Sequence, residues 1–285
     1  MELKELGNTG VMLPEIGLGT WKYTGGVEPL RRGIELGAFL IDTAEMYRTE
    51  DAVGQAVKGI RDRVFIATKV MGSHLRYDQV LRAAESSLRR LDTDHIDLYQ
   101  IHWPNSGVPI KETMRVMEIL VDAGQVRHIG VSNFSVKELE EACSVMTKYP
   151  IVSNQVLYNL KRREIAKDLL PYCQQNHITI IAYTPLADGS LAAQAPSQQS
   201  QPRSSLRRAA GRLLGRERAS QGLQEVADKV GKTPTQVALN WCISRPGVVA
   251  IPKSNIVARI EENCGASGWR LSEEQLRQLD EAFPA

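Results

Sequence analysis

Several short apolar runs in this sequence end in side chains that can carry out chemistry. Asp42 and Tyr47 follow one of these runs, Lys69 follows the next, and His102 follows the one after that. Each residue alone has an ordinary structural explanation, since Asp42 could cap a helix, Lys69 could lie at the surface and His102 could lie in a loop. Together they form a varied set of functional groups that structure alone does not require.

A tyrosine phenol can act as a general acid if a neighbouring ammonium makes it acidic enough. The phenol normally titrates near pH ~10, which is too high for efficient proton donation at neutral pH. An ammonium beside Tyr47 would lower the pKa of the phenol, and a buried ammonium needs a carboxylate partner. Lys69 and Asp42 can supply these two groups. A neutral His102 can hydrogen-bond to a carbonyl oxygen and orient it.

These groups suit the protonation of an alkoxide as hydride reaches a carbonyl carbon. The hydride must come from a nicotinamide, because no side chain can supply one. The next two strand-like runs are followed by Ser132, Asn133 and Gln155. These side chains offer donors and acceptors suited to a carboxamide. Tyr183 offers a flat face for the nicotinamide ring, although an ordinary aromatic at the end of a strand explains it equally well.

The last apolar run leads into residues suited to binding an anion. Lys253, Ser254 and the N-terminus of the following helix are expected to form an anion site, with Arg259 close by along that helix. Two charge-assisted bonds to a 2′-phosphate, at ~1.5–3 kcal/mol each before offsets, would favour NADPH over NADH by orders of magnitude. A capped helix with solvated basic residues explains the two cations singly, but not their pairing with Glu262 and Asn263, which suit the adenine.

Strand and helix patterns alternate along the chain and must position these groups. The helical patterns, one opened by an N-cap serine with a glutamate three residues on, lie at Asp78–Leu91, Lys111–Val121 and Ser135–Met146. The strand-like runs lie at Glu15–Leu18, Phe39–Ile41, Val64–Ala67, Ile96–Ile101, His128–Val131, Ile151–Ser153, Ile178–Ala182 and Val248–Ile251.

Strands that alternate with helices predict a parallel sheet with both faces covered. Eight such strands in 285 residues fit a (β/α)8 barrel, whose active site lies at the C-terminal ends of the strands. A Rossmann cofactor site is unsupported, because no complete G-x-G-x-x-G run follows a strand. We expect residues 1–285 to form a single domain.

Three segments lie outside the repeating pattern. We expect a β-hairpin around Gly7–Gly10 and a C-terminal helix at Glu273–Ala282. Residues 187–221 are rich in arginine and are expected to form a long surface loop with a short helix near Leu206–Leu214. A solvated loop is the favoured interpretation of this segment, ahead of closure over an anionic cofactor.

Composition excludes several classes of partner. The formal charge of +2 is too small to indicate a polyanion, so no nucleic acid is expected. No apolar run approaches the length of a membrane span, and the N-terminus lacks an export signal, so we expect a cytoplasmic protein that does not contact membranes. No disulfide and no zinc or other metal are expected, because the cysteines show no CxxC pair; they are Cys143, Cys173, Cys242 and Cys264.

Motifs spread over most of the chain resemble those of the aldo-keto reductase family, with wording most similar to bacterial members. The resemblance runs from about Leu3 to Phe283 and is interrupted only by the Arg-rich segment. The motifs are GLGTW at 17–21, DTAEMYRTEDAVG at 42–54, TKV at 68–70, DHIDLYQIHWP at 94–104, IGVSNFS at 129–135, NQVLYNL at 154–160, AYTPL at 182–186 and IPKSNIVARIEEN at 251–263.

The resemblance implies a monomeric barrel that binds extended NADP(H) without a Rossmann fold. It implies a catalytic tetrad in which Tyr47 is the general acid, Lys69 tunes its pKa, Asp42 pairs with Lys69, and His102 orients the carbonyl. The substrate pocket would be lined by Trp21 and Trp103. The implied cofactor contacts are Thr20, Ser132, Asn133, Gln155, Tyr183, Leu186, Lys253, Ser254, Arg259, Glu262 and Asn263.

The favoured function is NADPH-dependent reduction of small-molecule aldehydes and ketones to alcohols. One alternative is a nicotinamide-binding regulatory subunit with slow catalysis that docks a partner through the Arg-rich segment. A less favoured one is an aldolase or isomerase in which Lys69 forms a Schiff base. That alternative leaves Asp42, Tyr47 and the residues from Lys253 to Asn263 unexplained.

Overall fold

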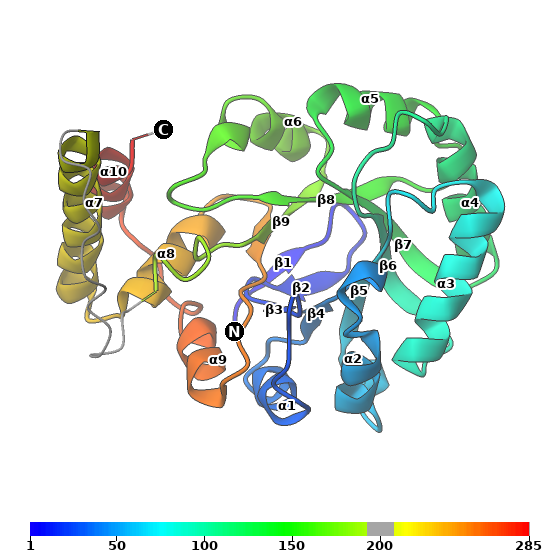
Figure 1. The fold of residues 1–285 in the computed structure, drawn as a ribbon, viewed down its shortest axis with the longest axis horizontal. Coiled ribbons are helices and arrows are strands. Elements are labelled where there is room, and N and C mark those ends of the chain that lie inside the picture. The colour runs from blue at the N-terminus through cyan, green and yellow to red at the C-terminus, as the bar shows by residue number, and fades with distance from the viewer. Residues whose placement is uncertain (193–207, 285) are drawn as a thin grey trace.

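The computed structural model describes residues 1–192 and 208–284, with the backbone alone for residues 208–217. Within these ranges eight parallel strands form one curled sheet with helices around it (Figure 1). Neighbouring strands follow chain order from β3 to β10. The strands are β3 (Leu18–Gly19), β4 (Leu40–Asp42), β5 (Phe65–Val70), β6 (Ile96–Ile101), β7 (Val126–Ser132), β8 (Ile151–Leu157), β9 (Thr179–Tyr183) and β10 (Val248–Ala250).

Hydrogen bonds between the two ends of the sheet close it into a barrel. The amide of Gly17 donates to the carbonyl of Ala250 over 2.8 Å, and the amide of Ala250 donates to the carbonyl of Glu15 over 2.9 Å. The amide of Gly19 donates to the carbonyl of Pro252 over 3.1 Å. The (β/α)8 barrel predicted from the alternating pattern is therefore confirmed, with its strands displaced by a few residues from the apolar runs.

Amphipathic helices cover the outside of the barrel. In α3 the residues Val80, Ala84 and Leu91 are buried on one face, as the periodicity predicts. At the start of α5, the predicted N-cap Ser135 forms a capping box with Glu138. The helices are α1 (Glu28–Glu35), α2 (Glu50–Val57), α3 (Tyr77–Leu91), α4 (Ile110–Asp122), α5 (Val136–Ser144), α6 (Leu169–Gln175), α8 (Pro234–Ile243) and α9 (Val257–Cys264), with 3-10 turns η1 (Glu45–Tyr47), η2 (Arg61–Arg63) and η3 (Glu164–Ala166).

The barrel interior holds an apolar core towards the N-terminal ends of its strands. Leu40, Phe65 and Leu98 belong to this interior cluster, while Tyr99, the next residue along β6, packs in the larger cluster between the sheet and the helices. Side chains of a strand alternate between the two faces, so every second residue points inward. Counting by two along the chain from Leu98 leads to His102, just after the C-terminal end of β6. The same parity places the polar strand-end residues at one mouth of the barrel.

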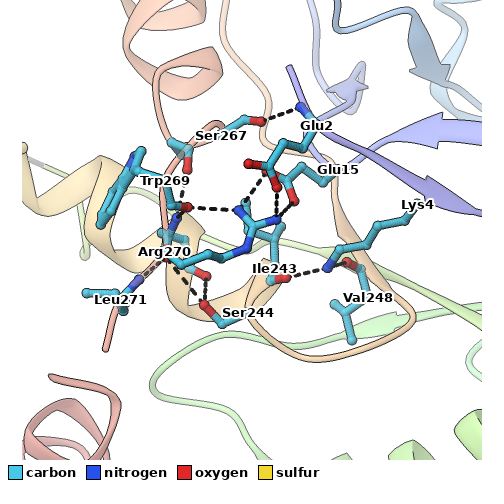
Figure 2. Close-up of polar contacts among 12 residues, drawn as sticks. Glu2, Lys4, Glu15, Ile243, Ser244, Val248, Ser267, Trp269, Arg270 and Leu271 are labelled. Atoms are coloured by element: carbon cyan, nitrogen blue, oxygen red, sulfur yellow. Dashed lines mark hydrogen bonds and ion pairs between the residues drawn. The ribbon is translucent and has the colours of Figure 1, made fainter. Parts of the chain in front are cut away.

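The opposite mouth is covered by the predicted N-terminal hairpin, β1 (Leu3–Glu5) and β2 (Met12–Pro14). The ammonium of Lys4 donates to the carbonyl of Val248 over 2.7 Å, and also contacts the carbonyl of Ile243 (Figure 2). Arg270 donates to the carboxylate of Glu15 over 2.6 Å and contacts that of Glu2. These bonds tie the hairpin and Glu15 to residues 243, 248 and 270 and hold the hairpin over this mouth. The predicted site residues lie at the other mouth.

The Arg-rich segment differs from its prediction. Residues 187–192 form turns and residues 193–207 lie outside the described residues, but the chain from residue 208 is helical, as α7 (Arg208–Val230). The predicted short helix near Leu206–Leu214 is thus confirmed from residue 208 onward, but the helix continues, so the predicted loop is wrong over 215–221. Arginine, leucine and alanine are good helix formers, so the polar composition was compatible with a helix.

Helix α7 has a partner in the fold. It lies beside α10 (Glu273–Ala282), which matches the predicted C-terminal helix, and both helices lie at one end of the molecule (Figure 1). Leu223 and Val226 of α7 are buried, and an added Cβ at Gly222 would lie 2.7 Å from the Cβ of Ala282. The two helices thus pack closely. Among the described residues, no helix has the length and apolar character needed to cross a membrane.

Candidate active site

The polar residues predicted at the strand ends surround one cavity of about 600 Å³. Lys69 lies fully buried, and every other predicted site residue lines the cavity wall. Those lining residues are Thr20, Trp21, Asp42, Tyr47, His102, Trp103, Ser132, Asn133, Gln155, Tyr183, Leu186, Lys253, Ser254, Arg259, Glu262 and Asn263.

A buried ion pair joins the ends of two adjacent strands. The ammonium of Lys69, on β5, lies 2.8 Å from both carboxylate oxygens of Asp42, on β4, and donates to the carbonyl of Thr43 over 2.8 Å. Burial lowers the pKa of Lys69, but Asp42 and Tyr47 together raise it by more, so the net pKa lies above the ordinary value. Lys69 is therefore a permanent ammonium at neutral pH.

The hydroxyl of Tyr47 lies within reach of that ammonium. The distance from its oxygen to the Lys69 nitrogen is 3.4 Å, and the ammonium lies 4.7 Å from the centre of the tyrosine ring. Burial raises the pKa of Tyr47; Lys69 lowers it and Asp42 raises it, and the net pKa is above the ordinary value. The expectation of a net lowered pKa is therefore wrong, because burial outweighs the ammonium. The phenol is protonated at neutral pH, and the ammonium of Lys69 lies close enough to stabilise a phenolate by charge attraction.

His102 lies at the end of β6 and faces the same phenol. Its ring centre lies 5.4 Å from that of Tyr47 in a T-shaped arrangement, and 4.5 Å from that of Trp103. Burial and the nearby charge of Lys69 lower the pKa of His102 to about 3. The imidazole is therefore neutral at physiological pH and can donate one hydrogen bond to a substrate oxygen.

The predicted amide-recognising residues are linked to one another. Asn133 has a backbone φ of 62°, a left-handed conformation that asparagine tolerates well. Its amide nitrogen donates to the carbonyl of His102 and to the hydroxyl of Ser132, both over 3.0 Å, while its oxygen accepts from Tyr183 over 2.9 Å. Much of the hydrogen-bonding capacity of Asn133 is thus used within the protein. It fixes the position of its neighbours and keeps one acceptor site free.

Gln155 connects this group to the ion pair, a link that sequence reasoning missed. Its side-chain nitrogen donates to Asp42 over 2.7 Å, whereas its side-chain oxygen accepts no hydrogen bond within residues 1–192 and 208–284. The hydroxyl of Thr20 likewise donates inward, to the backbone carbonyl of Asp42 over 2.9 Å. The contact from Gln155 on β8 to Asp42 on β4 leaves no local pattern in a sequence, because these strands lie far apart in the chain and are not neighbours in the sheet.

The far end of the cavity carries two cations. Lys253 and Arg259 are exposed, and neither forms an ion pair with any residue in the described part of the chain. The hydroxyl of Ser254 accepts from the amide of Ile256 over 3.1 Å, so it helps to fix the turn before α9. The described residues contain no cluster of histidine, cysteine or acidic side chains that could hold a metal ion.

Other residues lining the cavity were not predicted. Adjacent residues gave a usable signal in two cases, because Lys22 follows Trp21 and Met46 precedes Tyr47. Five further lining residues fall inside the family-like motifs at 17–21, 182–186 and 251–263; they are Gly19, Thr184, Pro185, Ile251 and Pro252. The remaining ones lie outside those motifs and include Asp188, Gly189, Ala192 and Thr235.

Comparison with known proteins gives consistent matches. The model of the aldo/keto reductase family matches residues 15–283. Methylglyoxal reductase YeaE of Escherichia coli is 38% identical over 286 residues, covering 96% of this chain and 93% of that protein. Glyoxal reductase of Bacillus subtilis is 35% identical over 279 residues, covering 96% of this chain and 90% of that protein.

Solved structures match over the whole chain as well. The thermostable aldo-keto reductase Tm1743 superposes with a TM-score of 0.86 at 40% identity, covering 99% of this chain and 100% of that one. An aldo/keto reductase from Klebsiella pneumoniae, solved with NADP and acetate, gives a TM-score of 0.83 at 38% identity, covering 99% of this chain and 95% of that one.

Proposed function

The chain belongs to the aldo/keto reductase family, and we propose that it acts as one monomeric domain that reduces small aldehydes and ketones with NADPH. One observation carries the proposal. The hydroxyl of Tyr47 lies 3.4 Å from the buried ammonium of Lys69, and the ring of a neutral His102 packs against the ring of Tyr47. This arrangement suits proton donation to a carbonyl oxygen.

The residues along the cavity fit a nicotinamide dinucleotide. At one end Gln155 offers its side-chain oxygen and Asn133 a second acceptor site, which suits a carboxamide. Tyr183 provides an aromatic ring on the same wall. At the other end Lys253 and Arg259 are exposed and suit a phosphate group, and the structures of two Klebsiella pneumoniae relatives contain NADP or NADPH. When bound there, NADPH supplies the hydride that reduces the carbonyl carbon.

Side chains of the protein itself orient the carbonyl and supply the proton. His102 donates a hydrogen bond to the carbonyl oxygen and holds it near the hydroxyl of Tyr47. As the C=O bond becomes an alkoxide, the O–H bond of Tyr47 breaks and its proton passes to the alkoxide oxygen. The resulting phenolate is stabilised by Lys69, whose own charge is balanced by Asp42. Solvent then returns a proton to Tyr47.

The walls of the cavity indicate the kind of substrate. Trp21 and Trp103 line it beside Tyr47, and the ring of Trp21 lies 4.9 Å from that of Tyr47. Trp21 is 47% exposed, so the entrance is open. An open pocket lined by aromatic rings suits small carbonyl compounds. The names of two relatives, a methylglyoxal reductase and a glyoxal reductase, favour small dicarbonyls among these.

The geometry of Lys69 argues against the Schiff-base alternative. A Schiff base requires a neutral amine that a substrate carbonyl can reach. The side chain of Lys69 is fully buried, and its nitrogen donates to Asp42 and Thr43 as an ammonium. The regulatory-subunit alternative rests on the Arg-rich segment, much of which lies outside the described residues, and it leaves a complete proton-donating group without a use.

A substrate screen tests the proposal. Purified protein is mixed with NADPH and a panel of glyoxal, methylglyoxal, simple aldehydes, ketones and keto sugars, and the loss of absorbance at the NADPH band is ranked by kcat/KM. We expect steady NADPH oxidation with at least the small dicarbonyls and aldehydes. Rates indistinguishable from a reaction without protein across the whole panel would overturn the proposal.

A further inference from the structure

The acid Tyr47 lies on a very short element. It ends the 3-10 turn η1 (Glu45–Tyr47), and the next residue, Arg48, has a backbone φ of 56°. A three-residue turn has few internal hydrogen bonds to hold it in place. The 3.4 Å contact from Tyr47 to Lys69 is longer than a typical hydrogen bond. A small movement of η1 would therefore change the distance on which proton donation depends.

One side chain of the same turn ties it to a neighbouring loop. The carboxylate of Glu45 accepts from the amide of Met71 over 2.9 Å, and its other oxygen lies 2.8 Å from Nδ1 of His74. The side chain of Glu45 is 18% exposed and that of His74 is 39% exposed. We call these two contacts the Glu45 bridge. Because Met71 directly follows β5, the strand that carries Lys69, the Glu45 bridge joins the element of the acid to the element of the ammonium.

The receiving loop is itself held from the other side. The side chain of Asn105 donates to the carbonyl of Gly72 over 2.7 Å. An added Cβ at Gly72 would lie 2.1 Å from the indole nitrogen of Trp103, so the loop packs directly against the pocket wall. The loop is thus a fixed support rather than a free strand end. A side chain that bonds to it can hold η1 in one position.

We propose that Glu45 is a positioning residue, which holds the turn of Tyr47 at the distance from Lys69 that proton donation requires. This inference rests on the proposed function. Glu45 touches neither substrate nor cofactor in this account and acts only through Tyr47. A misplacement of about 1 Å at a reacting group can lower a rate by about 10²-fold. Removing the Glu45 bridge should therefore lower kcat without weakening NADPH binding.

The test compares three variants in single-turnover reduction of one aldehyde from the screen. Glu45→Ala removes both contacts, whereas Glu45→Gln keeps an oxygen that can accept from Met71 and an amide that can face His74. Glu112→Ala is the matched control, because that carboxylate accepts from the amide of Tyr77 over 3.0 Å at the far end of the same loop without touching η1. The rate, its solvent deuterium isotope effect, the Kd of NADPH and the Tm are measured for each.

We expect Glu45→Ala to lower the rate roughly 10- to 100-fold and to raise the solvent isotope effect, with the Kd of NADPH unchanged. Glu45→Gln and Glu112→Ala should both stay within about 3-fold of the wild type. The proposal is overturned if Glu45→Ala keeps the wild-type rate. It is also overturned if Glu45→Ala and Glu112→Ala lose rate in proportion to their loss of Tm, because that would show a general structural role.

If Glu45→Ala does not fold, His74→Ala replaces it. That variant leaves the contact to Met71 and should lower the rate several-fold with a raised isotope effect; an unchanged rate would overturn the proposal. The failure of this inference is distinct from failure of the proposed function. In the first case the wild type reduces carbonyls and Glu45→Ala reduces them at the same rate, whereas in the second the wild type reduces no carbonyl at all.

Discussion

Replacing Lys69 by methionine isolates the electrostatic part of the mechanism, because methionine is also unbranched but carries no charge. At 3.4 Å and an effective dielectric constant of ~20, a full charge on the Tyr47 oxygen interacts with the ammonium by about 5 kcal/mol. If about half a charge has formed in the transition state, the loss is about 2.5 kcal/mol, or roughly 70-fold in rate. The unpaired carboxylate of Asp42 would repel the forming phenolate and add to the loss.

The assay is single-turnover oxidation of NADPH by a small aldehyde in a stopped-flow instrument, with the Kd of NADPH measured in parallel. We expect Lys69→Met to be about 10²-fold slower or more, with the Kd nearly unchanged. The double variant Asp42→Asn/Lys69→Met removes the repelling carboxylate and should recover part of the rate. A Lys69→Met enzyme within a few-fold of the wild type would show that the ammonium contributes little to the transition state.

Three further outcomes follow from the site. Because the pKa of His102 is lowered to about 3, kcat for reduction should stay level from about pH 5 to about pH 8, and a fall centred near the ordinary histidine pKa of ~6.5 would contradict a neutral imidazole. Lys253→Ala and Arg259→Ala should each raise the Kd of NADPH about 10- to 100-fold in a fluorescence titration while leaving that of NADH nearly unchanged; equal losses would argue against phosphate recognition. Gly72→Ala places a Cβ 2.1 Å from the indole nitrogen of Trp103, so KM for bulky aldehydes should change several-fold, and an unchanged KM would exclude this wall from substrate binding.

The sequence was sufficient to locate the cavity because a parallel barrel brings all strand ends to one mouth. Asp42 and His102 are far apart in the chain, yet each lies at the C-terminal end of a strand, and the barrel topology then places both at the same rim. The prediction needed only the order of strands, not the contacts between side chains. The predicted location of the cavity is therefore correct even though the strand boundaries differ by a few residues from those predicted.

The pKa of Tyr47 could not be predicted in the same way. The sequence identifies an ammonium that lowers it, but the degree of burial that raises it depends on packing by residues from several strands. The bond from Gln155 to Asp42 likewise joins side chains 113 residues apart. The full length of helix α7 was missed for a different reason, since its buried residues Leu223 and Val226 lie beyond the predicted short helix and the arginines that suggested a solvated loop.

The proposed reaction depends on transfer of a proton from the hydroxyl of Tyr47 to the reduced carbonyl. The most direct measurement is the rate of aldehyde reduction by Tyr47→Phe in a single turnover with saturating NADPH. We predict a rate lower by about 10²- to 10⁴-fold, with the Kd of NADPH within about 3-fold of the wild type. A Tyr47→Phe variant that reduces the aldehyde at the wild-type rate would contradict the account, because another group would then be supplying the proton.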